Sequence, residues 1–199
     1  MKRLLILAMF IPTTLLAQRG PYGRQGPFDA STVDSAGPAR AYTVGVLSYT
    51  GGDWVPTGLD FGMLWRISER TRTAAGAWLA LGSFTQANAI YFGQSRGFFA
   101  GLGLTLRQPI ATLFEMGSER SPSYVKIETA LEGGVSRDFN SPLPQGPWSF
   151  RGSFLAGVSL GSRSALGQSF SLMYGPSVFT GRAVTTHGLF VLRIRLAAH

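Results

Sequence analysis

Residues 58–68, GLDFGMLWRIS, alternate strictly between two kinds of side chain. One set of alternate positions contains only large apolar residues, namely Leu59, Phe61, Met63, Trp65 and Ile67. The other set contains glycines, Leu64, Ser68 and two charged residues, Asp60 and Arg66. Because successive side chains of a β-strand point to opposite faces, this pattern predicts a strand with one apolar face and one mostly polar face.

The same alternation recurs along the rest of the chain, and turn residues separate the segments that carry it. The predicted strands are 42–50, 57–68, 73–84, 97–107, 124–138, 148–161, 168–175 and 187–196. Their regular spacing favours an antiparallel meander in which neighbouring strands pair through hairpins. Residues 109–123 are predicted to form an extended turn around Gly117 and Pro122, with an additional short strand at 110–116 as the alternative.

The N-terminal region has the features of an export signal. Lys2 and Arg3 precede an apolar run at 4–16, and Ala17 offers a small residue for cleavage. This run is shorter than the ~20 residues that a membrane-spanning helix needs, so we predict a signal peptide at 1–17 rather than a retained anchor helix. Residues 18–40 are rich in Gly, Pro and Ser without periodicity, which indicates a flexible periplasmic segment before the folded domain at 41–199.

Charge and cysteine content limit the classes of partner and site. The formal net charge is +8, but no clustered basic run is present, so an exported chain of this kind is not expected to bind nucleic acid. Anionic lipid headgroups and lipopolysaccharide phosphates are the more natural counter-charges. The chain has no cysteine and two histidines, so we expect no disulfide, no metal site and no cofactor.

Alternation alone does not decide which face points inward. In a soluble barrel the apolar face is the core, whereas in an outer-membrane barrel it meets lipid and the polar face fills the interior. Strands of about 11 residues and a polar face rich in Gly and Ser favour the membrane alternative. Aromatic residues also gather near strand ends, as in the girdles of membrane barrels: Tyr42, Trp65, Phe84, Phe98, Tyr124, Trp148 and Phe150.

These patterns resemble the small eight-stranded outer-membrane barrels of the OmpA and OmpX kind, over residues 42–196. The resemblance implies an all-β, eight-stranded antiparallel up-and-down transmembrane barrel in the cell outer membrane, with both termini in the periplasm. It implies outward loops near 51–56, 85–96, 139–147 and 176–186, a monomer, and contact with lipopolysaccharide and the barrel-assembly machinery. Such barrels end in an aromatic residue, whereas this chain ends in His199.

The charged residues of the polar faces form the candidate site. They are Asp60, Arg66, Arg107, Lys126, Glu128, Glu132, Arg151, Arg193 and Arg195. In a narrow interior, opposite charges must pair because an isolated buried charge is costly. We therefore predict a plug of salt bridges, with Asp60 and Arg66 as one buried pair. The alternative is an anion-preferring pore, because six of these residues are basic and three are acidic.

Two other functions are weighed against this structural or surface-interaction role. Some barrels that this chain resembles modify lipid A with a His and a Ser at the outer rim. His187, Ser177 and Asp138 lie near that level, but no characteristic spacing joins them, so we expect no enzyme. Gly52-Asp53-Trp54 matches the Gly-x-Trp of lipocalins, which keeps a soluble periplasmic barrel that binds an apolar ligand as an alternative.

Overall fold

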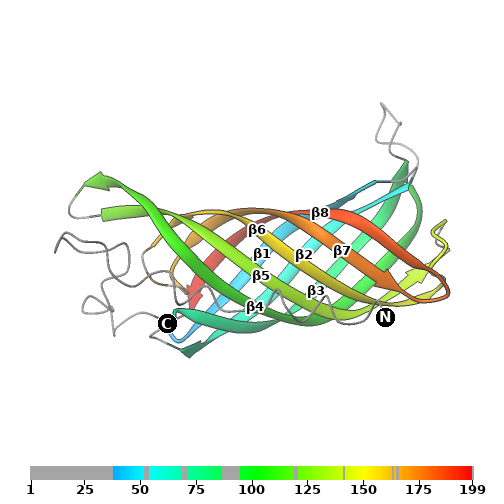
Figure 1. Cartoon of the computed structure of the whole chain (residues 1–199), viewed down its shortest axis with the longest axis horizontal. Coiled ribbons are helices and arrows are strands. Elements are labelled where there is room, and N and C mark those ends of the chain that lie inside the picture. The colour runs from blue at the N-terminus through cyan, green and yellow to red at the C-terminus, as the bar shows by residue number, and fades with distance from the viewer. Residues whose placement is uncertain are drawn as a thin grey trace, which may run out of the picture.

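A computed structural model describes residues 38–51, 54–68, 71–86, 95–118, 121–140, 142–162, 164 and 166–198. It contains the strands β1 (Arg40–Thr50), β2 (Trp54–Ser68), β3 (Thr73–Gln86), β4 (Ser95–Ser118), β5 (Ser121–Phe139), β6 (Trp148–Gly161), β7 (Ser169–Thr180) and β8 (Val184–Ala198). Consecutive strands pair antiparallel, and β1 also pairs with β8, so the sheet closes into a barrel (Figure 1). The predicted all-β, eight-stranded antiparallel fold is confirmed.

The predicted signal peptide and residues 18–37 lie outside the described residues. Among those that are described, none belongs to a helix long and apolar enough to span a membrane.

The two ends of the barrel carry different parts of the chain. β1 begins and β8 ends at one end, which we call the terminal end, together with the connections β2–β3, β4–β5 and β6–β7 (Figure 1). The opposite end, which we call the loop end, carries the connections β1–β2, β3–β4, β5–β6 and β7–β8. The four predicted outward loops therefore share one end of the barrel.

The turn predicted at 109–123 is wrong in its extent, and the alternative of a strand at 110–116 is confirmed. β4 continues without a break to Ser118, and its hairpin with β5 turns between the paired Gly117 and Pro122 and extends past the neighbouring strands at the terminal end (Figure 1). Pairing with β3 stops at Arg107, so beyond it β4 is an edge strand, where Pro109 is tolerated. Two β-bulges, after Pro109 and after Thr112, absorb the irregularity.

The long loop predicted at 176–186 is also wrong. β7 runs on to Thr180 and β8 starts at Val184, so only a three-residue turn joins them. Pro176 lies inside β7, at the point where the β6–β7 ladder is interrupted between the pairs Ser153–Ser177 and Ala156–Tyr174. Its missing N–H is therefore tolerated within the strand.

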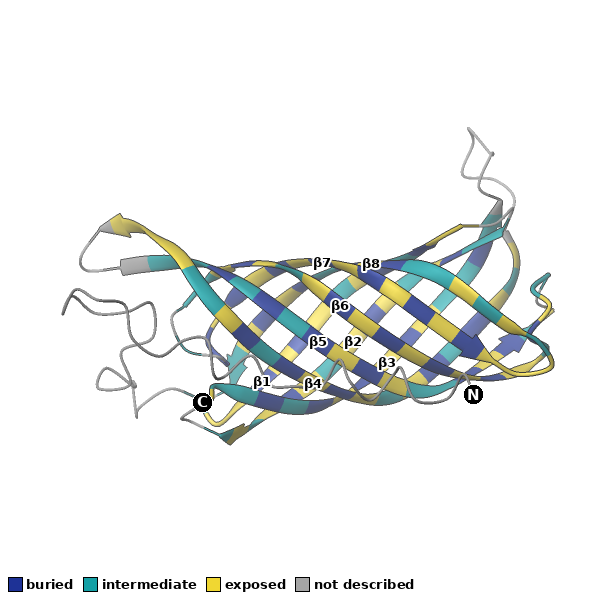
Figure 2. Ribbon diagram, viewed as in Figure 1, coloured by how far each residue is buried: buried dark blue, intermediate teal, exposed yellow. Residues whose placement is uncertain are grey.

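Side chains alternate between the interior and the outer surface along every strand (Figure 2). The alternate apolar residues Leu59, Phe61, Met63, Trp65 and Ile67 all face outward and are exposed, whereas Asp60 and Leu64 between them are buried. One predicted girdle residue differs, because Phe84 points inward and packs against Phe99 with their ring centroids 5.8 Å apart.

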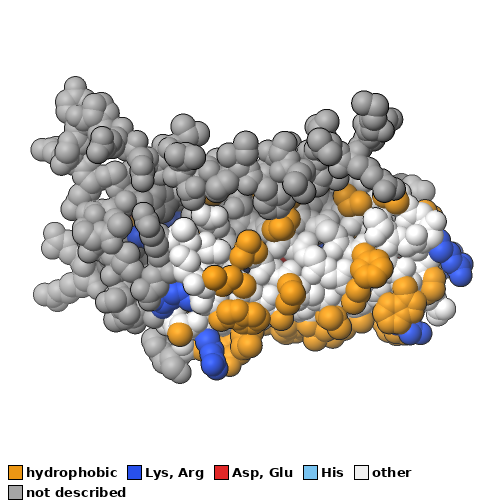
Figure 3. Space-filling model, turned by 60° about the horizontal axis from the view of Figure 1, so that its bottom comes forward, with side chains coloured by type: hydrophobic (Ala, Val, Ile, Leu, Met, Phe, Trp, Pro, Cys, Tyr) orange, Lys and Arg blue, Asp and Glu red, His pale blue; other side chains and the backbone are white. Residues whose placement is uncertain are grey.

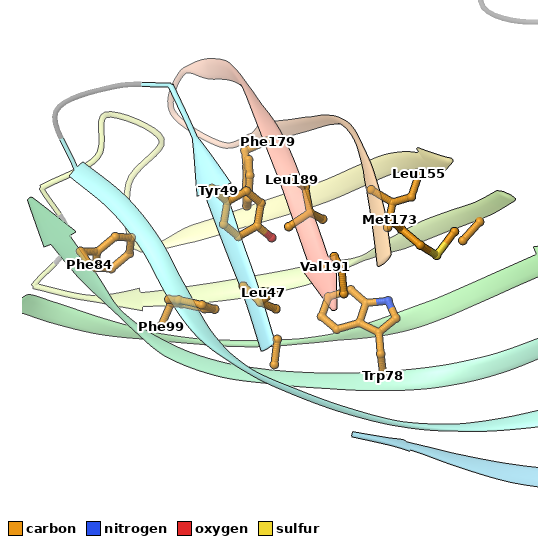
Figure 4. Close-up of a cluster of buried hydrophobic side chains, with 12 residues drawn as sticks. Leu47, Tyr49, Trp78, Phe84, Phe99, Leu155, Met173, Phe179, Leu189 and Val191 are labelled. Atoms are coloured by element: carbon orange, nitrogen blue, oxygen red, sulfur yellow. The ribbon is translucent and has the colours of Figure 1, made fainter. Parts of the chain in front are cut away.

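The interior of the barrel has an apolar part and a charged part. The apolar cluster lies toward the loop end and includes Leu47, Tyr49, Trp78, Phe84, Phe99, Leu155, Met173, Phe179, Leu189 and Val191 (Figure 4). In β8, Leu189 and Val191 are followed by the buried Arg193 and Arg195 nearer the terminal end. Trp78 lies next to both parts, because it belongs to the apolar cluster and its ring also contacts the buried Arg151. Its indole Nε1 donates a hydrogen bond to the Leu104 carbonyl at 3.2 Å.

Replacing Gly134 by alanine should destabilise the barrel, whereas the same change at the adjacent Gly133 should not. A Cβ at Gly134 would overlap the Leu102 carbonyl oxygen and lie 2.6 Å from Cζ2 of Trp78, so the backbone of β4 and the ring would both have to move, at a cost of about 1–3 kcal/mol. A Cβ at Gly133 would point outward and meet nothing closer than 4.0 Å. Urea unfolding followed by tryptophan fluorescence measures both variants, and equal midpoints would contradict the packing described for Trp78.

Candidate functional site

The structure buries eight of the nine predicted charged residues inside the barrel. Arg66 is the exception. It is half-buried at the terminal end, where its Nη2 donates a hydrogen bond to the Pro38 carbonyl at 2.7 Å. The predicted pair of Asp60 with Arg66 is therefore wrong, because the partner of Asp60 comes from the last strand instead.

Arg193 on β8 joins two carboxylates from opposite sides of the interior. Its Nε and Nη2 donate to the two oxygens of Asp60 on β2, the second over 2.8 Å. Its Nη1 donates to Oε1 of Glu132 on β5 at 2.6 Å. Charge-assisted and bidentate contacts of this kind are the strongest hydrogen bonds that side chains make.

A glycine on β1 makes the contact between Arg193 and Asp60 possible. Gly45 pairs with Asp60 on one side and with Arg193 on the other, so it lies between them in the sheet. A Cβ at Gly45 would come within 2.8 Å of Cγ of Arg193. Because Gly45 has no side chain, Arg193 can reach across β1, and the ion pair spans the seam where the first and last strands close the barrel.

Arg151 on β6 extends the network toward the loop end. Its Nη2 donates to Oε2 of Glu132 at 2.7 Å, and its Nη1 donates to the hydroxyl of Tyr49 at 2.6 Å. Its guanidinium carbon also lies 3.9 Å from the ring centroid of Trp78, in a cation–π contact. Glu132 therefore pairs each of its oxygens with a different arginine, and the network connects β1, β2, β3, β5, β6 and β8.

Glu128 is the centre of a second group nearer the terminal end. It accepts hydrogen bonds from Nη2 of Arg195 at 3.0 Å and from the Ser159 hydroxyl at 2.8 Å. The Lys126 ammonium lies 3.9 Å from the same carboxylate and donates to the Ser162 carbonyl at 2.8 Å. These contacts link the interior to the β6–β7 connection.

That connection closes the terminal end. Leu166 is fully buried there and packs against Ala41, Leu64 and Ala74 from β1, β2 and β3. At the loop end, the β5–β6 connection has a matching part, because Leu143 packs against the apolar cluster and Gln145 is buried. Described residues of both connections therefore pack into the two ends of the barrel.

Arg107 differs from the other buried cations in its hydrogen-bond contacts. Its Nη2 contacts the sulfur of Met173 at 3.7 Å, and its Nε and Nη1 find no hydrogen-bond partner within the described part of the chain.

Asp138 is a buried charge that the predicted set lacks. Ser136 and Gln145 donate to its carboxylate at 3.3 and 3.4 Å. The alternation contained a signal for it, because Asp138 shares the inward face of β5 with Lys126 and Glu128. With Arg66 only half-buried and Asp138 buried, the buried charges of the described residues are five cations and four carboxylates.

Little free space remains between these side chains. A cavity of about 10 Å³ lies toward the loop end, with Trp78, Phe99 and Arg151 among its lining residues. This volume suits about one water molecule.

The rim residues weighed for catalysis are only partly brought together. Ser177 and His187 are directly paired across β7 and β8. However, the Ser177 hydroxyl is hydrogen-bonded to that of Ser153 at 2.8 Å, and Nδ1 of His187 lies 2.8 Å from the Gly51 carbonyl. Among the described residues this is the only hydrogen bond of the His187 ring, so no base–nucleophile contact is formed. No group of three or more metal-ligating side chains occurs in the same residues.

Comparison with known proteins adds no relative: no family model matches the chain, and neither a curated protein nor a solved structure is similar to it.

Replacing Arg193 by alanine should destabilise the fold strongly, because Asp60 and Glu132 would each lose a buried partner. Breaking a buried ion pair costs about 3–5 kcal/mol. The matched control is Arg40→Ala, which removes an exposed arginine from β1 and should change little. Urea unfolding in detergent micelles measures both, and similar midpoints for the two variants would show that the network does not stabilise the barrel.

Proposed function

We propose that the protein is an outer-membrane β-barrel with a closed interior, and that it acts as a structural frame whose loop end takes part in surface interactions. The observation that carries this proposal is the inverted distribution of its side chains. Charged residues fill the part of the interior nearer the terminal end, and large apolar residues cover the outside. In lipid this arrangement is favourable, whereas in water it would expose an apolar surface all along the barrel.

The outer surface has the layout expected for a membrane crossing. Apolar side chains cover the middle of the face seen in Figure 3, and Lys and Arg side chains lie near both ends. The strands contain between 11 and 24 residues, against the ~9–11 that a tilted crossing requires. The soluble lipocalin-like alternative needs a polar exterior, whereas the outward face of the described strands is largely apolar.

A closed interior supports a structural role over transport. The ion pairs of Arg193, Arg151 and Arg195 fill the interior, and Leu166 and Leu143 cover its two ends. The anion pore was suggested by an excess of basic over acidic residues. Among the described buried residues, the cations outnumber the carboxylates by one. The isolated hydrogen bond of His187 favours a non-enzymatic role.

The proposal includes a path to the membrane and an orientation. Residues 1–17 direct export as a signal peptide, and the barrel is inserted by the assembly machinery as a monomer. The terminal end faces the periplasm, and the loop end faces outward among lipopolysaccharide molecules. No cofactor is involved.

Cell fractionation combined with gel electrophoresis tests the location. The protein should sediment with the outer membrane, and an unheated sample should migrate differently from a boiled one because the folded barrel resists detergent. A soluble periplasmic protein without a heat-modifiable band would overturn the membrane proposal in favour of the soluble barrel.

Conductance across a planar lipid bilayer tests the closed interior. Purified wild-type protein should give a current indistinguishable from that of the empty membrane, because paired charges fill the interior and both ends are covered. Stable, anion-selective steps at the wild-type protein would instead support the pore.

Replacing Phe61 by arginine should impair insertion, because its side chain points outward from the middle of β2. An arginine near the middle of a bilayer costs a β-barrel about 2–4 kcal/mol. The fraction that folds into phosphatidylcholine vesicles across a urea series measures this effect. Phe61→Leu is the matched control and should fold like the wild type, and equal folding of Phe61→Arg would place this face away from lipid.

A further inference from the structure

We propose that the outer surface of β5, β6 and β7 at the loop end binds one lipid that carries a phosphate monoester headgroup. Arg137 would hold the phosphate, and a groove beside it would hold an acyl chain. This inference rests on the proposed membrane location and adds to it a specific site and a ligand class.

Arg137 lies in an aromatic setting on the outside of the barrel. It is exposed on the outward face of β5, and its guanidinium carbon is 5.0 Å from the ring centroid of Phe139 and 4.8 Å from that of Trp148. Phe139 in turn stacks on Phe98, with centroids 4.4 Å apart. Contacts with ring faces orient a guanidinium and leave its N–H groups free to donate in its plane.

No carboxylate within the described part of the chain forms an ion pair with Arg137. An arginine on the lipid-facing side of a barrel is costly unless it lies at the level of the headgroups. Trp148 beside it is typical of that level, because aromatic side chains favour the membrane–water interface. The natural partner of Arg137 is therefore an anionic headgroup, and a phosphate accepts two parallel hydrogen bonds from a guanidinium.

A groove starts next to the Arg137 cluster. Its volume is about 260 Å³, and it is lined by Val135, Trp148, Ser149, Phe150, Thr180 and Gly181. One step further from the rim, Gly133 and Gly152 are paired across β5 and β6 and both face outward. A Cβ at Gly152 would meet no atom within 4 Å, so the surface beyond Phe150 is low and open. An acyl chain fits this path from the rim toward the middle of the barrel.

The charges on the outside of the loop end favour one class of headgroup. Among the described residues of the loop end, the charged side chains on the outside are Arg96, Arg137 and Arg182, and the one carboxylate, Asp138, points inward. Arg182 directly follows Gly181 of the groove. Three cations without an outward carboxylate favour a headgroup with more than one negative charge and disfavour a zwitterionic headgroup that carries its own cation.

Native mass spectrometry of the full chain, folded in neutral detergent, tests the site with dioleoyl phosphatidic acid and dioleoyl phosphatidylcholine as probes. The protein should retain one phosphatidic acid molecule with roughly tenfold preference over phosphatidylcholine, as expected for one charge-assisted contact. Arg137→Gln should abolish this preference. The matched control is Arg40→Gln, which removes an exposed arginine paired with the aromatic Trp65 at the terminal end and should keep the preference.

Two further arms test the groove and the ligand source. Thr180→Phe should fill the groove and lower phosphatidic acid retention, although it leaves every arginine in place. Inorganic phosphate at millimolar concentration should not displace the lipid, and displacement would overturn the assignment of a lipid. Arg137→Lys keeps the charge without the planar fork, and should bind phosphatidic acid between the wild type and Arg137→Gln.

The outcomes separate this inference from the proposed function. A barrel that shows the heat-modifiable band but binds both lipids equally, or binds phosphatidic acid equally in Arg137→Gln and Arg40→Gln, overturns the lipid site alone. A protein that stays soluble without detergent and retains neither lipid overturns the membrane location, and the lipid site with it.

Discussion

Arg193 carries the contact on which the closed barrel depends. It reaches over Gly45 to Asp60 and across the interior to Glu132, so one side chain links the last strand to the second and fifth. A sheet becomes a barrel only when its first and last strands pair, and this ion pair lies on that seam. The cost of burying charge is offset because every oxygen of Asp60 and Glu132 accepts a hydrogen bond from an arginine.

The interior network and the apolar exterior are two consequences of one alternation. A narrow barrel leaves room for long charged side chains on its inner face only where the neighbouring inner positions are small. Gly45 makes room for Arg193, and Gly103 and Gly134 make room for Trp78. The same strands then place their large residues outside, where no part of the described chain covers them. A lipid environment covers this surface without any further protein element.

The alternation was sufficient to predict the eight strands and the face of most charged residues, because period two is a local property. The hairpin ends were predicted less well. Strands were predicted to end before Pro109 and Pro176, although β4 continues past the first on an edge and β7 continues past the second at a gap in a ladder, and neither context is visible in the local sequence. The partner of Asp60 was missed because it is more than 130 residues away, across the closing seam. The inward position of Asp138 could have been predicted from the alternation, because Asp138 lies on the same face of β5 as Lys126 and Glu128.

The two ends of the barrel differ in a way that concentrates interactions on one outer surface. Leu166 and Lys126 tie the β6–β7 connection into the terminal end, and Leu143 of the β5–β6 connection packs against the apolar cluster at the loop end. With the interior charges engaged in ion pairs, groups that face outward are the ones available for recognition. At the loop end the outward charges of the described residues are arginines, and Arg137 is held by aromatic rings beside a groove. The barrel thus separates its charges by position, because those inside pair with one another and those outside remain available to the lipid of the proposed membrane location.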